Sequence, residues 1–209
     1  FFFSPCGGWL RWCLRQHLFF AMPETLIVVH TQGQTYYFEP GQQPSESVYG
    51  DPLQLRLHGN FGPAPLHHIA TLSTEHLPML GGISLPLLYG FQYSGCTLDY
   101  RYSPLEVNLL DMDPQESTPE WPYADYPPLL PRLALRLASV QAERWEDFSS
   151  RARYPNLPAR QSAELVAVIP APLHIGQSLW GEDGDDEGVC VVCECDLTRH
   201  QVHSYNICS

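Results

Sequence analysis

The sequence predicts an α+β protein in which a mostly antiparallel β-sheet dominates and one long amphipathic helix packs beside it. Hydrophobic residues make up 44% of the 209 residues and charged residues 16%, a balance typical of a globular chain. Twenty prolines and fifteen glycines divide the chain into many short segments, which favours strands. Only residues 131–150 place apolar side chains at helical spacing, so we expect the single long helix there.

The first half of the chain contains several segments with the properties of strands. Residues 26–30 are apolar and β-branched, residues 35–38 are aromatic, and Gln32-Gly33 between them predicts a hairpin. Leucines alternate with polar residues over 53–58, which is the period of a half-buried strand. Residues 66–72 are expected to form another strand.

The segment 85–102 predicts a second hairpin. Ser94-Gly95 is a turn dipeptide between two apolar runs. A two-residue turn there pairs Tyr93 with Cys96 and gathers aromatic and aliphatic side chains on one face. Pro86 either limits the start of the first strand or places that strand at a sheet edge, because proline has no N–H to donate.

The helix is expected over residues 131–150. Pro131 suits the first turn, where its missing N–H needs no partner. The side chains that fall near one stripe at helical spacing are Leu133, Leu137, Val140, Arg144, Trp145 and Phe148. The acidic, proline-rich residues 111–128 before the helix predict a long loop.

Residues 105–110 and 163–169 predict two further strands, and residues 189–207 predict a closing hairpin. If its turn is centred on Arg199-His200, Cys195 lies opposite Ser204. The sheet would then be completed at the carboxyl end of the chain.

Residues 22–209 are expected to form a single α+β domain. Met22 directly precedes the first expected strand, which indicates the natural start of translation. Residues 1–21 then represent upstream-translated or vector-derived sequence. The alternative is a short amphipathic helix that docks on a partner or a membrane surface.

Charge narrows the function classes. All eleven basic residues are arginines and the formal net charge is −12, so lysine-dependent chemistry such as Schiff-base formation is excluded. A negative surface repels phosphate backbones, so we expect no nucleic-acid partner. A basic partner protein is easier to accommodate. We expect no membrane partner and no cofactor.

Four of the seven cysteines lie between residues 190 and 208. The odd number of cysteines and the lack of a secretory signal predict reduced thiols and a cytoplasmic location. One interpretation of this end of the chain is a zinc site in which Cys190 and Cys193 supply two ligands, and His200 with His203, or Cys208, complete the four. We favour the other, a strand that points Cys190 and Cys193 to opposite faces, where they cannot hold one ion.

The adjacent histidines His67 and His68 predict either ordinary surface or core-edge residues or the base of a hydrolase site. At most one of them joins any one site, because neighbours on a strand point to opposite faces. A hydrolase would place one histidine beside a carboxylate in a concave pocket. The sequence contains neither a G-x-S-x-G nor an H-E-x-x-H motif.

We favour a non-enzymatic binding protein that acts through protein–protein contacts. Trp121, Tyr123 and Tyr126 lie in a proline-stiffened loop, where aromatic side chains make good interface anchors. Asp99 and Arg101 share one face of a strand and form either a surface pair or part of a binding face. The alternatives are a zinc-binding protein and a hydrolase with a His/carboxylate site.

Two stretches resemble a bacterial family. Residues 66–102 combine an apolar strand, a Leu-Pro dipeptide and a strand–turn–strand unit. The end of the chain combines Trp180-Gly181, an apolar strand, Asp196-Leu197 and a final aromatic-x-x-Cys strand. Both are similar to stretches of YwqG-like proteins. The resemblance implies a sheet-dominated α+β cytosolic protein with two related halves, and it assigns no chemistry because that family has none assigned.

Overall fold

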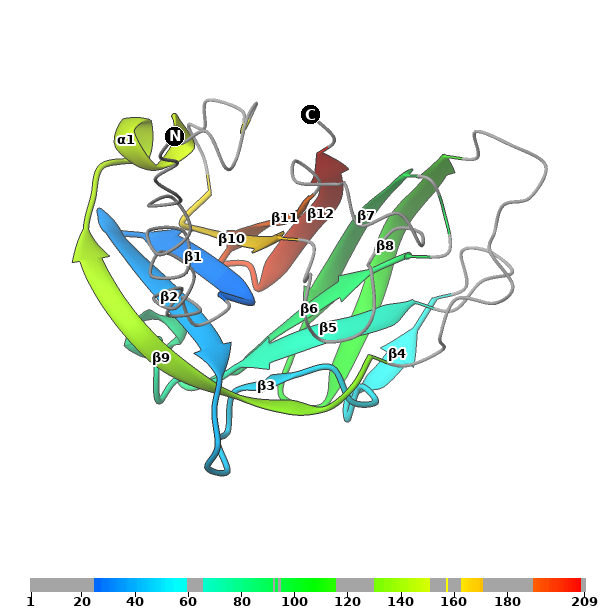
Figure 1. The fold of residues 1–209 in the computed structure, drawn as a ribbon. Coiled ribbons are helices and arrows are strands. Elements are labelled where there is room, and N and C mark those ends of the chain that lie inside the picture. Colours follow the sequence, from blue (N-terminus) through cyan, green and yellow to red (C-terminus); the bar gives the residue numbers. More distant parts are fainter. Residues whose placement is uncertain are drawn as a thin grey trace, which may run out of the picture.

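The computed structural model describes residues 25–59, 66–91, 93, 95–115, 130–150, 157, 163–170 and 190–207. Twelve strands and two short helices make up the regular structure of these residues (Figure 1). The elements in chain order are β1 (Ile27–Thr31), β2 (Gln34–Pro40), β3 (Val48–Tyr49), β4 (Arg56–His58), β5 (His67–Leu72), the 3-10 helix η1 (Pro78–Leu80), β6 (Leu85–Tyr89), β7 (Gly95–Tyr102), β8 (Glu106–Gln115), β9 (Leu133–Ala142), α1 (Trp145–Ser149), β10 (Leu165–Pro170), β11 (Cys190–Asp196) and β12 (Gln201–Ile207).

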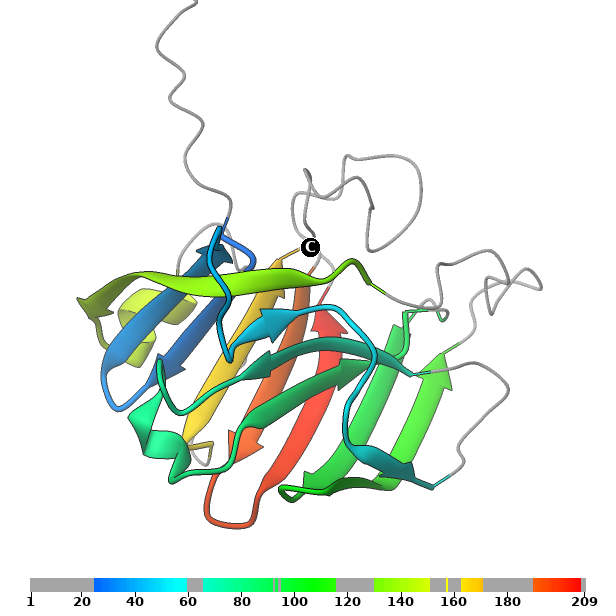
Figure 2. The same ribbon diagram turned by 90° about the horizontal axis from the view of Figure 1, so that it is seen from below.

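All twelve strands belong to one sheet in the order β4-β8-β7-β12-β11-β10-β1-β2-β9-β3-β5-β6. Only the pair β4–β8 is parallel among the described strands. The long strand β9 pairs with β2 over residues 135–142 and with β3 over residues 133–134. It thereby carries the sheet around a corner, and β3, β5 and β6 lie across the face of β10, β11 and β12 (Figure 1, Figure 2).

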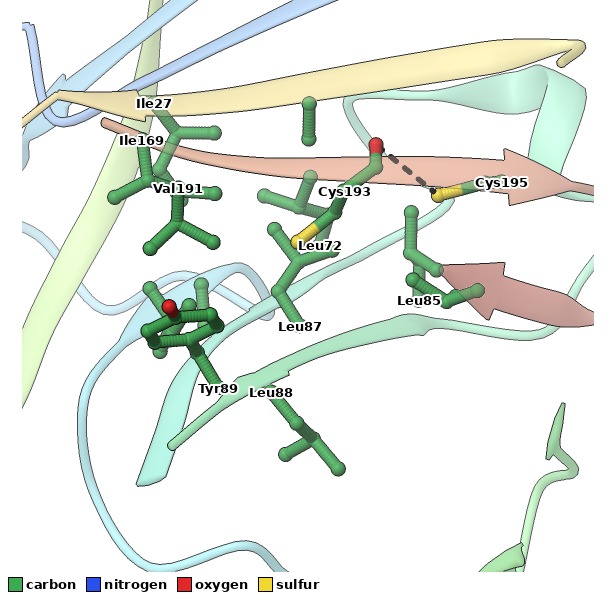
Figure 3. Close-up of a cluster of buried hydrophobic side chains, with 14 of the residues drawn as sticks. Ile27, Leu72, Leu85, Leu87, Leu88, Tyr89, Ile169, Val191, Cys193 and Cys195 are labelled. Atoms are coloured by element: carbon green, nitrogen blue, oxygen red, sulfur yellow. Dashed lines mark hydrogen bonds between the residues drawn. The ribbon is translucent and has the colours of Figure 1, made fainter. Parts of the chain in front are cut away.

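The main hydrophobic core lies between these two layers of the folded sheet. Ile27, Ile169 and Val191 reach it from one layer, and Leu72 and Leu87 reach it from the other (Figure 3). All five side chains are fully buried. Burial of this apolar surface is the main force that holds the two layers together.

A second, smaller core lies on the opposite face of the layer that contains β1, β10 and β11. Phe148 of the short helix α1 packs there against Val28, Val166 and Val192. These valines alternate along their strands with residues of the main core, so the middle of this layer is covered on both faces.

The edge strand β6 is fastened to the facing layer by side-chain hydroxyls. The Tyr100 hydroxyl accepts a hydrogen bond from the Leu88 N–H at 3.1 Å and donates to the Pro86 carbonyl at 2.8 Å. The Ser204 hydroxyl donates to the Leu88 carbonyl at 3.0 Å. These bonds satisfy backbone groups that a sheet edge leaves unpaired. Of the two positions predicted for Pro86, the structure has the second, a strand at the sheet edge.

The hairpin predicted around Gln32-Gly33 is confirmed. β1 and β2 pair from Ile27↔Phe38 to Thr31↔Gln34. Gln32 and Gly33 have φ values of +50° and +71°, and positive φ at both central residues is the arrangement of a type I′ turn, whose twist matches that of the flanking strands.

The predicted α+β class with a long helix over 131–150 is wrong. The segment forms strand β9 and then the five-residue helix α1. Leu133 and Leu137 fit both a helical stripe and a strand face, but Leu135 fits only the period of two, and it is fully buried in the main core. Pairing with β2 on one side and β3 on the other decides for the strand.

The predicted pairing of the segment 85–102 is also wrong, although both strands exist. β6 pairs with β5, whereas β7 pairs with β8 and β12. Their apolar faces meet across the main core and not edge to edge. The closing hairpin is confirmed with its register shifted by two residues, since Cys195 lies opposite Val202. A shift of two leaves every side chain on its predicted face.

Candidate functional site

Five carboxylates point away from the main core on neighbouring strands, and we call them the outer acidic face. Strand alternation places them there, since each lies next to residues that point into the core. The members are Asp99 on β7, Asp111 and Asp113 on β8, and Glu194 and Asp196 on β11. Asp111 and Asp113 are exposed and the other three are half-buried.

Asp99 is the centre of this face. It lies directly opposite Asp111 on one side and His203 on the other. Its Oδ1 is 3.0 Å from the Nδ1 of His203, with exposed side-chain fractions of 29% and 40%. His203 in turn lies opposite Glu194, whose carboxylate accepts a 2.8 Å hydrogen bond from the Tyr205 hydroxyl. Aspartates directly opposite each other repel, so this arrangement opposes folding.

Arg101 is exposed on the same face of β7, two residues from Asp99. The predicted pair of Asp99 and Arg101 therefore shares a face with the carboxylates and with His203. The predicted aromatic anchors Trp121, Tyr123 and Tyr126 lie outside the described residues.

The candidate zinc ligands are dispersed among the residues that the structure describes. Cys190 packs in the smaller core and Cys193 in the main core, so the two thiols lie on opposite faces as predicted. His200 lies in the β11–β12 turn and His203 on the outer acidic face. No group of three potential ligands forms among the described residues. Cys208 lies outside them.

Four described cysteines are buried, and we call them the buried thiols. They are Cys96, Cys190, Cys193 and Cys195. Burial raises the pKa of Cys193 well above its ordinary value and that of Cys96 to about 12. Thiols of this kind behave as small hydrophobic side chains and not as metal ligands or nucleophiles.

A cavity of about 450 Å³ lies over the outer surface of β5 and β6, beneath the residues that follow β3. His68 and Thr71 of β5 line it together with Asp51 and Arg132. His67, the neighbour of His68, is buried and packs its ring against Phe91 at 5.4 Å. The two histidines thus face opposite sides of the strand, as predicted.

The two ring nitrogens of His68 are both engaged. Nδ1 lies 3.0 Å from the carbonyl oxygen of Asp51, and Nε2 lies 2.8 Å from the Thr71 hydroxyl. Burial lowers the pKa of His68 below its ordinary value of 6.5, so the ring is neutral at pH 7. A carbonyl oxygen only accepts, so Nδ1 carries the proton and Nε2 accepts from Thr71.

The Gly50–Asp51 turn positions this arrangement. Both residues have left-handed φ values, +66° for Gly50 and +72° for Asp51. A Cβ on Gly50 would meet the Pro131 carbonyl oxygen at 2.2 Å, so only glycine fits. Asp51 directs its carbonyl at His68 and its carboxylate at Arg132, with which it forms an ion pair.

Sequence reasoning did not select Asp51, Arg132, Asp111 or Asp113. The turn sequence Gly50-Asp51-Pro52 is a local signal for an unusual backbone, and it could have drawn attention to Asp51. No local signal pairs Asp51 with Arg132, because 81 positions separate them in the chain.

No protein-family model, curated protein or solved structure matches this chain. The resemblance to YwqG-like proteins therefore stays a prediction. Among the described residues, the structure contains no helix with the length and apolar character needed to cross a bilayer.

Proposed function

We propose that the protein binds a basic partner protein through the outer acidic face. The observation that carries the proposal is the pair Asp99 and Asp111, directly opposite each other on β7 and β8, with Asp113 two positions further along β8. Like charges at opposed positions of a sheet destabilise it, by roughly 0.2–1 kcal/mol. A cost of this kind in the free protein is explained if a cationic partner removes it on binding.

The surroundings of the pair support a macromolecular partner with several positive charges. The carboxylates lie on three strands, β8, β7 and β11, within the run of four neighbours β8-β7-β12-β11, so they form a broad surface and not a point site. The whole chain carries a net charge of −12, which steers cationic partners toward it.

The predicted aromatic anchors Trp121, Tyr123 and Tyr126 remain part of this proposal, because aromatic side chains supply the apolar contacts that charge alone does not. The proposal also keeps the cytoplasmic location predicted from the thiols.

The test is the substitution Asp111→Asn, which removes the repulsion with little change of shape. We expect it to raise the free energy of unfolding of the free protein by up to about 1 kcal/mol. We expect it also to weaken capture of partner protein from a host extract by about tenfold, equivalent to about 1.4 kcal/mol. Urea denaturation and quantitative affinity capture measure the two effects.

The matched control is Glu75→Gln, which removes one exposed carboxylate from the β5–β6 connection, outside the acidic face. It should change neither quantity. If Asp111→Asn lowers stability, or if both variants reduce capture equally, the acidic face is not the binding surface.

A further inference from the structure

The cavity over β5 is independent of the outer acidic face, and its wall carries a hydroxyl held by a neutral histidine. Thr71 donates its hydroxyl proton to Nε2 of His68 at 2.8 Å. Its oxygen keeps its lone pairs, and the side chain is only half-buried where it lines the cavity. A hydroxyl bonded to a basic nitrogen, itself oriented by a third group, is the arrangement of an activated nucleophile.

The third group is the backbone carbonyl of Asp51. By accepting from Nδ1, it fixes the tautomer that leaves Nε2 as the base. The turn that delivers this carbonyl contains a left-handed aspartate, a conformation that costs about 1–3 kcal/mol and that clusters at functional sites. The strain is maintained by hydrogen bonds from Gly50 N–H to the Ile69 carbonyl and from Asp51 N–H to the Leu130 carbonyl.

The remaining walls define the chemistry of a substrate. Val48 and Pro86 lie on either side of Thr71 in the register of β3 and β6, and Leu53 and Ile83 also line the cavity. These side chains suit a short apolar group. Arg132 also lines the cavity, with a side chain that is 64% exposed, and its guanidinium has N–H groups beyond the one that binds Asp51.

We propose that Thr71 and His68 form an acyl-transfer site for small carboxylic esters with a short apolar acyl group. Thr71 Oγ1 adds to the ester carbonyl carbon while its proton passes to His68 Nε2. The bond from the carbonyl carbon to the leaving oxygen then breaks, and His68 returns the proton to that oxygen, which releases the alcohol. Water repeats the two steps on the threonine ester and releases the acid.

The negative charge that develops on the ester carbonyl oxygen needs a hydrogen-bond donor to stabilise it. The guanidinium of Arg132, which lines the cavity, is that donor. His68 is the group that must be neutral for the first step. The other titratable groups on the cavity are Glu46, Asp51 and Arg132. Because burial holds the pKa of His68 below 6.5, the rate should rise with pH, pass its midpoint below pH 6.5 and level off at higher pH.

The experiment uses the full chain and para-nitrophenyl butyrate as the probe. We expect release of nitrophenolate above the buffer rate, and its loss in Thr71→Val, which keeps the shape of the side chain without the hydroxyl. Thr71→Ser keeps the hydroxyl and should keep the activity. His68→Gln should lower the rate by about 10²–10⁴-fold, the usual contribution of a general base.

Mass spectrometry after acid quenching should find a butyryl group on the peptide that contains Thr71. Unfolding curves for each variant identify any loss that is due to misfolding, and the serine variant provides a folded reference. Equal turnover by the wild type and Thr71→Val, or a butyryl group on another residue, would overturn the proposal. Glu75→Gln removes an exposed carboxylate that lies outside the cavity and outside the acidic face, and it should leave turnover unchanged.

Discussion

We expect the hydroxyl of Tyr100 to stabilise the contact between the two layers of the sheet through its hydrogen bonds to β6. Tyr100→Phe removes one buried oxygen that makes two hydrogen bonds, at 3.1 Å with the Leu88 N–H and at 2.8 Å with the Pro86 carbonyl. A buried polar group left without a partner costs about 1–3 kcal/mol. With one donor and one acceptor affected, we expect the free energy of unfolding to fall by about 3 kcal/mol.

A loss of this size should lower the melting temperature by roughly 6–12 °C for a chain of this length. Urea denaturation and a thermal melt followed by circular dichroism measure both quantities. Tyr102→Phe is the matched control, because Tyr102 is a buried tyrosine on the same strand whose hydroxyl bonds to no described residue. It should cost less than about 1 kcal/mol.

Ser204→Ala tests the second side-chain hydroxyl that holds β6 against the facing layer. Ser204 donates to the carbonyl of Leu88, the residue whose N–H binds Tyr100. Because both bonds hold one residue of β6, the two substitutions should couple by about 0.5–3 kcal/mol in a double-mutant cycle. A Tyr100→Phe variant within about 0.5 kcal/mol of the wild type would refute the reasoning, since the edge of β6 would then be satisfied in another way.

Three further predictions concern the turn, the histidine and the thiols. Gly50→Ala should lower the free energy of unfolding by at least about 3 kcal/mol, and Gly81→Ala by only about 1 kcal/mol. The two glycines have nearly equal φ values, +66° and +67°, but only a Cβ on Gly50 would meet backbone atoms. Equal losses of stability in urea denaturation would contradict the clash at Gly50. Burial lowers the pKa of His68, so the unfolded chain binds more protons and stability should fall as pH falls below about 6.5. His68→Gln should flatten part of that fall, and an unchanged pH profile would argue against a neutral ring. Iodoacetamide at about pH 8 should leave the buried thiols unmodified until urea unfolds the chain, as peptide mass mapping would show.

The sequence predicted the features that depend on local pattern. Gln32-Gly33 specifies a tight turn between two strands, and that hairpin forms. The alternation along β11 separates Cys190 from Cys193, and this separation does not depend on the register with β12, because both residues lie on one strand. Face and turn chemistry are therefore readable from a few neighbouring residues.

The misplaced helix shows where local pattern is ambiguous. Leucines at 133, 135 and 137 satisfy a strand, whereas 133 and 137 alone satisfy a helix. The choice depends on two partner strands, β2 and β3, which lie far away in the sequence. Pairing with them overrides local preference, as it often does for strands.

The pairing error over residues 85–102 has the same origin and a larger consequence for function. Two strands with apolar faces can meet edge to edge or face to face, and the turn residues between them do not decide which. In this fold β6 and β7 meet face to face, so β7 is free to pair with β8 and β12. That pairing alone brings Asp99 beside Asp111 and beside His203, which is 104 positions away.

Both candidate sites therefore arise from contacts between distant segments, and both break a local rule. The outer acidic face opposes two carboxylates that a stable sheet would avoid, and the cavity depends on an aspartate in a left-handed conformation. The opposed carboxylates are not visible before the strand partners are known, whereas Gly50-Asp51-Pro52 gives a local signal of the unusual turn. In natural proteins, local preferences generally agree with the global fold, and the exceptions cluster at functional sites. Selection for function therefore explains the opposed carboxylates and the left-handed aspartate better than selection for stability does.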